Sequence, residues 1–415
     1  AEAIAVQGQR VLGLAYKHAD TQQSVLSHDD LKDGVIFLGL LGLIDPPRQE
    51  AITALEECHR AGIGVKMVTG DHALTASAIG KQIGLTHSDH VMTGTQIDDL
   101  SDDELSKAVL ETDIFARTTP EHKLRLVMAL QAHKMTVAMT GDGVNDAPAL
   151  KRADAGIAMG QKGSEAAKEA SELVLADDNF ASIVAAVREG RTVYNNIKKV
   201  ISWTLPTNAG EASVIILALL FGMMLPVTPI QILWVNMITA VTLGIALAFE
   251  PADAYTMRRA PRARNEPLLN GELLWHITLV AVLFVAGVFG MYHYAAVRHD
   301  DIGYARTVAM NTLGVMEIFH LLYIRNLHNI HLSIEVMKGT KALWIAVGII
   351  VAAQIAITYL SPMQRVFETR AIEGLDALLI LGAGVTLFAL VETEKQIRIR
   401  FFHYLSSTAQ RRKGD

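Results

Sequence analysis

Cysteine is nearly absent from this sequence of 415 residues, in which Cys58 is the only one. A single cysteine excludes an intramolecular disulfide and any metal site built from several cysteines. An excess of positive charge is also lacking, because 37 lysine and arginine residues are set against 43 aspartate and glutamate residues, for a net charge of −6. This balance gives no indication of nucleic acid as a partner.

Charge is missing from long stretches of the second half of the chain. The segment 342–360, ALWIAVGIIVAAQIAITYL, contains no charged side chain, and a helix of about 20 apolar residues crosses a bilayer. Comparable apolar segments lie near 200–224, 228–249, 273–295, 306–324 and 376–392. The sequence therefore predicts an all-α transmembrane domain of six helices at 186–400, followed by a tail at 401–415.

The loops between these spans differ in their content of basic residues. The loop after the second span contains Arg258, Arg259, Arg262 and Arg264, whereas the loop at 225–227 has neither lysine nor arginine. The loop after the fourth span and the tail are also basic, and cytoplasmic loops carry such an excess of positive charge. We therefore predict that the amino-terminal half and both ends of the chain lie in the cytoplasm, and that the membrane is the plasma membrane.

The first half of the chain alternates short apolar runs with helical patterns. VKMVTGD (65–71), DIFAR (113–117) and TVAMTGDG (136–143) are short runs of this kind, and HALTASAIGKQIG and EHKLRLVMALQAH, which separate them, have helical periodicity. This alternation predicts βαβ units and a parallel sheet, that is, a Rossmann-like α/β domain. Open sheets of this kind bind ligands at the carboxyl ends of their strands.

The same turn, TGD, ends two of these runs, at 69–71 and at 140–142. Asp142 and Asp146 offer the hard oxygen ligands that Mg²⁺ prefers, and Mg²⁺ usually shares its shell with a phosphate. The Thr69 hydroxyl and the N–H groups that follow it suit a phosphoryl oxygen, and Lys123 adds a positive charge. Positioning and charge neutralisation are most of what phosphoryl transfer requires. We therefore predict that these groups surround one cleft.

Four motifs in the first half also carry a resemblance to a known family. They are DPPR (45–48), MVTGD (67–71), ARTTPEHK (116–123) and MTGDGVNDAPAL (139–150). In this order, and followed by six spans, they resemble the P-type cation-transporting ATPases, in particular the calcium pumps. The resemblance implies a haloacid dehalogenase fold for a phosphorylation domain at 36–185, the end of a nucleotide-binding domain at 1–35, and ATP and Mg²⁺ as cofactors.

The resemblance implies roles for individual residues of the head. Thr69 and Lys123 would contact an aspartyl phosphate, Asp142 would ligate Mg²⁺, and Asn145 and Asp146 would complete that site. Gly70 and Asp71, next to Thr69, are implied to share in catalysis. Contacts to the nucleotide are implied for Asp45, Arg48, Thr69, Gly70, Asp71, Arg117 and Lys123.

The family's nucleophile has no counterpart in this sequence. It is an aspartate in the motif DKTGT, and no such stretch occurs in the 415 residues. We expect it upstream, with the rest of the nucleotide-binding domain, the actuator domain and the first four spans. The implied partners are an inorganic cation, the lipid bilayer and this missing amino-terminal part. By itself, the chain is predicted to be inactive and to form no phosphoenzyme.

Polar residues within three spans predict a cation site in the membrane. Asn208 and Glu211 in the first span are three residues apart, as are Asn236 and Thr239 in the second, so each pair shares one face of a helix. The fourth span contributes Glu317. A carboxylate within a span is energetically costly and marks a functional site by default. By resemblance, these positions match oxygen ligands of the calcium pumps.

Two neighbouring residues affect how this site is interpreted. Pro206 lacks an N–H, so it is predicted to disrupt the first span and free backbone carbonyls. Ala240 stands where the resemblance to calcium and sodium–potassium pumps implies an aspartate that helps bind the ions. We therefore predict a single transported cation per cycle, with Ca²⁺ as the leading candidate and Mg²⁺, Mn²⁺ or Na⁺ as alternatives.

Each polar group in the spans also has a purely structural interpretation. Glu211 can pair with another helix, Asn236 and Thr239 can form hydrogen bonds between helices, and Glu317 can face a water-filled gap or pair with nearby His320. For the whole protein, the alternatives are a membrane-anchored phosphatase without transport and a lipid flippase. Carboxylates in the spans argue against the phosphatase, and a flippase has little need of such an oxygen cluster.

Overall fold

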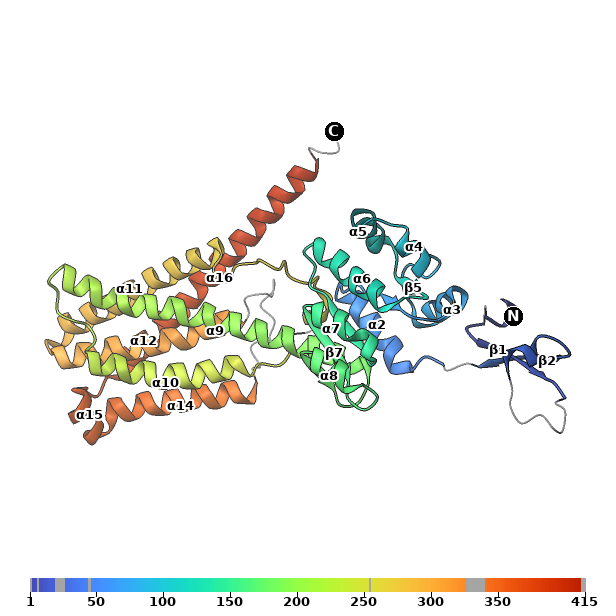
Figure 1. Cartoon of the computed structure of the whole chain (residues 1–415). Helices are drawn as coiled ribbons and strands as arrows, with labels where there is room; N and C mark the ends of the chain where they lie inside the picture. Colours follow the sequence, from blue (N-terminus) through green and yellow to red (C-terminus); the bar gives the residue numbers. More distant parts are fainter. Residues whose placement is uncertain are drawn as a thin grey trace. The chain divides into compact units, whose positions relative to one another are not determined.

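The computed structural model describes residues 2–5, 7–18, 27–43, 46–253, 255–325 and 340–411. The chain divides into two compact units, one of Ala1–Glu189 with Asp253–Glu266 and one of Gly190–Ala252 with Pro267–Asp415. The first unit, called the head below, holds all the described strands, and the second, called the bundle, is helical (Figure 1).

An antiparallel ribbon of two strands begins the head. α1 (Glu2–Ala5) and the turn η1 (His28–Leu31) accompany β1 (Arg10–Tyr16) and β2 (Ile36–Leu43), which pair with one register shift, between Leu14 and Ala15. The neighbouring side chains of Leu40 and Leu41, which lie in the regularly paired part of β2, are 38% and 50% exposed. Because neighbouring side chains in a strand point to opposite faces, both faces of this ribbon carry exposed apolar surface.

The next part of the head is a parallel α/β layer. Its sheet has the strand order β3–β5–β4, with all pairs parallel. The central strand β5 is buried because Phe115 packs with Leu105 and Leu126 on one side, whereas Ile114 packs with Leu55 on the other. The elements are α2 (Gln49–Arg60), β3 (Met67–Val68), α3 (Ala73–Ile83), β4 (Val91–Thr93), α4 (Gly94–Asp98), α5 (Asp102–Glu111) and β5 (Ile114–Ala116).

A second parallel layer follows, with the strand order β6–β7–β8. The helix α6 packs on both layers, because Leu126 and Ala129 contact the cluster around Phe115, whereas Val127 contacts Val137 of the second layer. The elements are α6 (Pro120–Ala132), β6 (Ala138–Gly141), η2 (Val144–Asp146), α7 (Ala147–Arg152), β7 (Ala155–Met159), α8 (Glu165–Ala170) and β8 (Leu173–Leu175).

The parallel α/β class predicted from the sequence is confirmed, with one difference in detail. The strands from β3 to β8 form two three-stranded parallel sheets rather than one, and β3 and β6 are each at the edge of their own sheet. The sequence pattern could not reveal this, since periodicity predicts strands but not their neighbours.

Six helices of the bundle are long and apolar enough to cross a membrane, as predicted. They are α9 (Phe180–Leu220), α10 (Pro229–Ala248), α11 (Gly271–His299), α12 (Ile302–Arg325), α14 (Lys341–Tyr359) and α16 (Gly374–Arg411, with its apolar part before Arg400). Two short helices complete the described chain, η3 (Thr256–Arg258) in the head and α15 (Ser361–Phe367) in the bundle.

The helix α12 lies at the centre of the bundle. Of its most apolar window, 83% is buried, against 28–39% for the other five spans. Met316 of α12 packs with Trp203, Phe284 and Leu387 in one cluster, so α12 contacts side chains of α9, α11 and α16. A central helix keeps its polar residues away from lipid, and Glu317 accordingly lies inside the bundle.

The disruption of the first span predicted at Pro206 does not occur. The helix α9 runs without a break from Phe180 to Leu220. The Thr207 hydroxyl, next to the proline, donates to the carbonyl oxygens of Trp203 at 3.0 Å and Thr204 at 2.9 Å. A neighbouring hydroxyl that bonds the carbonyls of the preceding turn is one way in which a membrane helix tolerates proline.

Candidate functional site

The turn after β3 holds Thr69 and Asp71 close together. The Thr69 hydroxyl accepts a hydrogen bond from the Asp71 N–H at 3.1 Å and lies 3.2 Å from the Asp71 carboxylate. The Thr69 carbonyl accepts two hydrogen bonds from Thr118, from its N–H at 3.2 Å and its hydroxyl at 3.1 Å. Gly70, between them, is exposed. The turn is therefore tied to the segment that leads into α6.

The turn after β6 is organised around Asp146. Its Oδ2 accepts hydrogen bonds from the N–H groups of Asp142 at 3.3 Å and Gly143 at 3.1 Å, and Lys123 Nζ lies 2.6 Å from its Oδ1. A methyl group added at Gly141 would lie 2.5 Å from the Asp146 Cβ, so this side chain can fold over the turn only because glycine precedes it. Lys123 thus connects α6 to the end of β6.

These contacts separate the candidate magnesium ligands into two kinds. Both oxygens of buried Asp146 are used within the protein, whereas Asp142 and Asn145 are exposed. An exposed carboxylate suits Mg²⁺, because the ion keeps several waters and takes one or two carboxylates. Asp142 therefore fits a magnesium ligand directly, and Asp146 fits that role only after Lys123 turns from it toward another anion.

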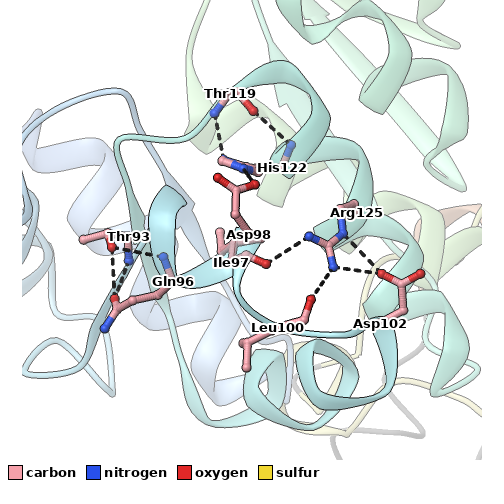
Figure 2. Close-up of polar contacts among 9 residues, drawn as sticks. All are labelled: Thr93, Gln96, Ile97, Asp98, Leu100, Asp102, Thr119, His122 and Arg125. Atoms are coloured by element: carbon pink, nitrogen blue, oxygen red, sulfur yellow. Dashed lines mark hydrogen bonds and ion pairs between the residues drawn. The ribbon is translucent and has the colours of Figure 1, made fainter.

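The residues at the start of α6 fix the position of Lys123. Figure 2 shows Arg125 reaching over the loop between α4 and α5, where it donates to the carbonyl oxygens of Ile97 at 2.9 Å and Leu100 at 2.8 Å. The same guanidinium pairs with Asp102 at 2.9 Å. The first turns of α6 are therefore anchored to the first layer, while Lys123 reaches the second.

The residues predicted to contact a nucleotide are spread over the head. Arg117 is exposed and has φ of 52°, in the left-handed region, and its N–H donates to the Asp71 carbonyl at 3.1 Å. Arg48 is exposed near the start of α2, and its Nη1 lies 3.5 Å from the Asp178 carbonyl. Asp45 lies outside the described residues. Arg117 thus adjoins the Thr69 turn, whereas Arg48 contacts a different loop.

Two carboxylates away from these turns, the buried Asp113 and the partly buried Asp154, stabilise the segments next to the strands of the head. Burial by itself would raise the pKa of Asp113, but the ammonium of Lys66 at 2.9 Å holds that pKa below its usual value. The Val137 N–H, which donates to Asp154 at 2.9 Å, and then Gln131 and Arg264, hold the pKa of Asp154 low as well. Asp113 thus fixes the start of β5, and Asp154 fixes the segment before β6.

A cavity of about 400 Å³ lies within the bundle, among α9, α10 and α12. All five residues predicted as cation ligands line it, together with Trp203 and Ala240. Glu211 and Glu317 are 4% and 1% exposed, and the Asn236 amide donates to Glu211 Oε2 at 2.6 Å. The polar residues of three separate spans therefore converge on one space, and it includes the position of the missing aspartate.

The oxygens of this cavity are incompletely satisfied. Within the described part of the chain, Glu211 Oε1 and Glu317 Oε2 have no hydrogen-bond partner. The Thr239 hydroxyl donates back to Val235 at 2.9 Å, which leaves its lone pairs available. Buried oxygen atoms without partners are costly, so the cavity has the chemistry of a site for a cation or for protons.

Sequence reasoning did not find a histidine pair between α11 and α12. His276 Nε2 lies 3.0 Å from His320 Nε2, and both rings are buried. His320 therefore pairs with His276, contrary to the alternative of a pair with Glu317. No sequence signal indicated this, because the two residues are 44 positions apart on different spans.

The same sequence compared with known proteins gives consistent matches. Residues 5–154 match the haloacid dehalogenase-like hydrolases, and residues 224–397 match the family described as cation transporting ATPase, C-terminus. The "Cation-transporting ATPase pma1" of Synechocystis is 45% identical over 89% of this chain and 41% of that protein. The "Calcium-transporting ATPase" of Bacillus subtilis is 39% identical (91% and 42%), and the human "Calcium-transporting ATPase type 2C member 2" is 37% identical (86% and 38%).

The fold and these matches define the class as a haloacid dehalogenase-like hydrolase domain joined to a multi-pass membrane bundle. The chain contains a haloacid dehalogenase-like hydrolase region and a region that matches the carboxyl-terminal part of the cation transporting ATPases, and it is similar to proteins named cation-transporting and calcium-transporting ATPases. It spans about two fifths of the length of the curated relatives that it matches.

Proposed function

We propose that this chain is the phosphorylation domain and the last six spans of a pump that hydrolyses ATP to move a cation across a membrane. The observation that carries this proposal is the cavity in the bundle, where Glu211, Asn236 and Glu317 converge with two carboxylate oxygens unpartnered among the described residues. A phosphatase without transport has no use for such a costly site.

The head supplies the phosphoryl chemistry in this proposal. Thr69, Gly70 and Asp71 offer a hydroxyl and N–H groups for a phosphoryl oxygen, and Lys123 supplies the positive charge. Asp142, with Asn145 and Asp146 beside it, holds Mg²⁺, which neutralises charge on the phosphate. ATP contacts are assigned to Asp45, Arg48 and Arg117, with help from the Thr69 turn and Lys123.

The upstream part of the protein completes the head. β3 and β6 are both edge strands, and their following turns hold Thr69 and Asp142. A further parallel strand between them fits this arrangement and would bring an aspartate nucleophile to the same edge, where an aspartyl phosphate forms. The ribbon β1–β2, with exposed Phe37 and Leu38, is the end of a nucleotide-binding domain that further upstream strands cover.

The cation that fits best is Ca²⁺, carried singly. Two carboxylates, Glu211 and Glu317, match the charge of one divalent ion, and the amides and hydroxyls of Asn208, Asn236 and Thr239 add the neutral oxygen ligands that Ca²⁺ takes. Two of the relatives carry calcium in their names. Mg²⁺, Mn²⁺ and Na⁺ are the alternatives, because Ala240 offers no third carboxylate.

The head is assigned to the cytoplasm and the pump to the plasma membrane. The basic loop after the second span supports this orientation, because Asp253–Glu266 is part of the head unit and Arg264 pairs with Asp154 at 2.7 Å. A loop that packs on the head lies on the same side of the membrane, and positive loops are cytoplasmic.

The test is ATP hydrolysis by the full-length pump in vesicles, titrated with Ca²⁺, Mg²⁺, Mn²⁺ and Na⁺ in turn. Hydrolysis should require one of these ions, and labelled ATP should leave acid-stable phosphate on the full-length protein but not on the present chain. Hydrolysis that requires none of these ions would favour the phosphatase without transport. A labelled band on the present chain would mean that the nucleophile lies within it.

A further inference from the structure

His122 lies next to the phosphate-site lysine and is almost completely enclosed. Its side chain is 5% exposed, although it stands in the first turn of a helix at the surface of the head. The Thr119 N–H donates to His122 Nδ1 at 3.1 Å, and the Thr119 hydroxyl accepts from the His122 N–H. The imidazole therefore takes the part that Glu or Gln plays in a capping box.

The hydrogen bonds define the state of this ring. Because Nδ1 accepts from a backbone N–H, it carries no proton, so the proton of the neutral ring is on Nε2. Nε2 lies 2.7 Å from Asp98 Oδ1 and donates to it (Figure 2). The ring thus connects the cap of α6 to the end of α4, using both nitrogens.

The surroundings of the ring hold it in one place. A methyl group added at Gly94 would lie 2.8 Å from His122 Cε1 and 2.4 Å from the Arg117 carbonyl oxygen, so only glycine allows this approach. Figure 2 also shows the capping pair Thr93 and Gln96, which fixes the start of α4, with the Thr93 N–H donating to Gln96 at 2.8 Å. The helix α4, which ends at Asp98, is therefore itself anchored.

The geometry separates the anchoring face of α6 from its reacting face. His122 and Arg125 are three residues apart and share a face, and both bind the α4–α5 segment. Lys123 is the next residue, about 100° around the helix, and points to Asp146 instead. The first turn of α6 is thus clamped by its neighbours on one side so that Lys123 reaches across on the other.

We propose that His122 is a positioning residue. Together with Asp98, it orients the Lys123 ammonium toward a phosphoryl group at the Thr69 and Asp142 turns. The proposal rests on the proposed function. Lys123 Nζ lies 2.6 Å from Asp146 Oδ1. Because the first turn of α6 is fixed, only the side chain of Lys123 has to rotate. This rotation moves the ammonium from the Asp146 carboxylate to a phosphoryl oxygen.

The experiment uses the full-length pump, with orthovanadate and Mg²⁺ as a probe of the phosphoryl site. Binding of orthovanadate is measured as protection of the protein from cleavage by trypsin, so inactive variants can also be measured. His122→Ala should raise the half-protecting vanadate concentration by about tenfold to a hundredfold, the scale of a small misplacement of a catalytic group. His122→Gln should restore most of the protection, because an amide can both accept from Thr119 and donate to Asp98.

The matched control is His133, which ends the same helix. Its Nε2 lies 2.6 Å from the Ser106 carbonyl of α5, so it also ties α6 to a neighbour, but far from Lys123 in the chain. His133→Ala should leave vanadate protection unchanged. An equal loss in both histidine variants would mean general weakening of the helix and would overturn the proposal.

A double variant separates this inference from the proposed function. If His122 acts through Lys123, His122→Ala should add nothing to the effect of Lys123→Ala. Additive effects, or an unchanged His122→Ala, would refute the positioning role while the pump proposal stands. A Lys123→Ala variant with normal protection and normal hydrolysis would refute the phosphoryl site itself.

Discussion

The turn after β6 in the head and the cavity in the bundle both gather carboxylates, but the carboxylates differ in how they are paired. In the head, Asp146 has its two oxygens on Lys123 and on backbone N–H groups, and the exposed Asp142 faces water. In the bundle, Glu211 is bound by Asn236 through one oxygen, while its other oxygen and Glu317 Oε2 have no partner in the part of the chain that the structure describes.

The difference follows from the medium around each site. In the head, the buried Asp146 carboxylate is paired with the partly exposed Lys123 ammonium, so its charge is offset within the protein. Inside a membrane, a carboxylate oxygen without a partner costs free energy. A positive charge bound in the cavity would offset this cost. In the function that we propose, the head exchanges an anion and the bundle takes a cation.

The strongest test of this comparison is Glu211→Gln in the full-length pump. Removing one of two carboxylates takes away half of the charge that offsets a divalent ion, while the amide keeps the shape. We expect ion-stimulated ATP hydrolysis to be abolished, as measured by titration with Ca²⁺ on reconstituted protein.

Glu272→Gln is the control for that variant. Glu272 is also a bundle glutamate, but it pairs with Arg398 at the start of α11 and is exposed. Its substitution should leave the ion response intact. An unchanged response in Glu211→Gln for every ion would mean that transport does not use this cavity.

The next largest effect should come from Asp142→Asn in the head. The side chain is exposed, so folding should be unaffected, but a hard ligand loses its charge. Turnover should fall by about a hundredfold or more, the scale of losing one electrostatic group at a reacting phosphate. The measurement is hydrolysis against Mg²⁺ concentration, with exposed Asp103→Asn of α5 as the control; wild-type rates in Asp142→Asn would remove it from the mechanism.

Ala240→Asp should sharpen the comparison by adding charge to the cavity that Ala240 lines. A third carboxylate should favour divalent over monovalent cations, shifting the ratio of half-activating Ca²⁺ and Na⁺ concentrations by about tenfold, or roughly 1.4 kcal/mol. Ala240→Ser, which adds an oxygen without charge, is the matched control. Equal shifts in both variants would show that charge is not what selects the ion.

The smallest effect concerns stability in acid. The Val137 N–H, Gln131 and Arg264 lower the pKa of Asp154 from 3.8 in the folded head. A lowered folded pKa adds stability above the unfolded value, and this stability is lost as pH falls through the folded one. Asp154→Asn should lower the melting temperature of the head by about 2–4 °C at pH 7 and by less below pH 4. A deficit that grows in acid would contradict this assignment.

Much of the architecture was predictable because local patterns carry it. Uncharged segments of bilayer length predicted six spans, and all six are helices. The TGD turns were predicted as strand ends, and β3 ends at Val68 and β6 at Gly141. The helix through Pro206 was not predictable, because proline rules describe a helix by itself, whereas Thr207 bonds the carbonyls of the preceding turn.

The cavity shows where sequence reasoning ended. Spacing within one helix put Asn236 and Thr239 on a common face, but nothing local specifies which helices become neighbours. Only the packing of α9, α10 and α12 brought Glu211 and Glu317 to one space, and only the packing of α11 on α12 brought His276 to His320.

The sequence by itself determined the class of this protein, through a parallel α/β domain and six spans that contain carboxylates. The tertiary structure decided which groups are satisfied and which are not. In the structure, Lys123 pairs with Asp146, and His122 is bound between Thr119 and Asp98. One oxygen each of Glu211 and Glu317 has no partner among the described residues. The physical reason is that residue type and spacing act within a single element, whereas hydrogen-bond satisfaction depends on which elements pack together.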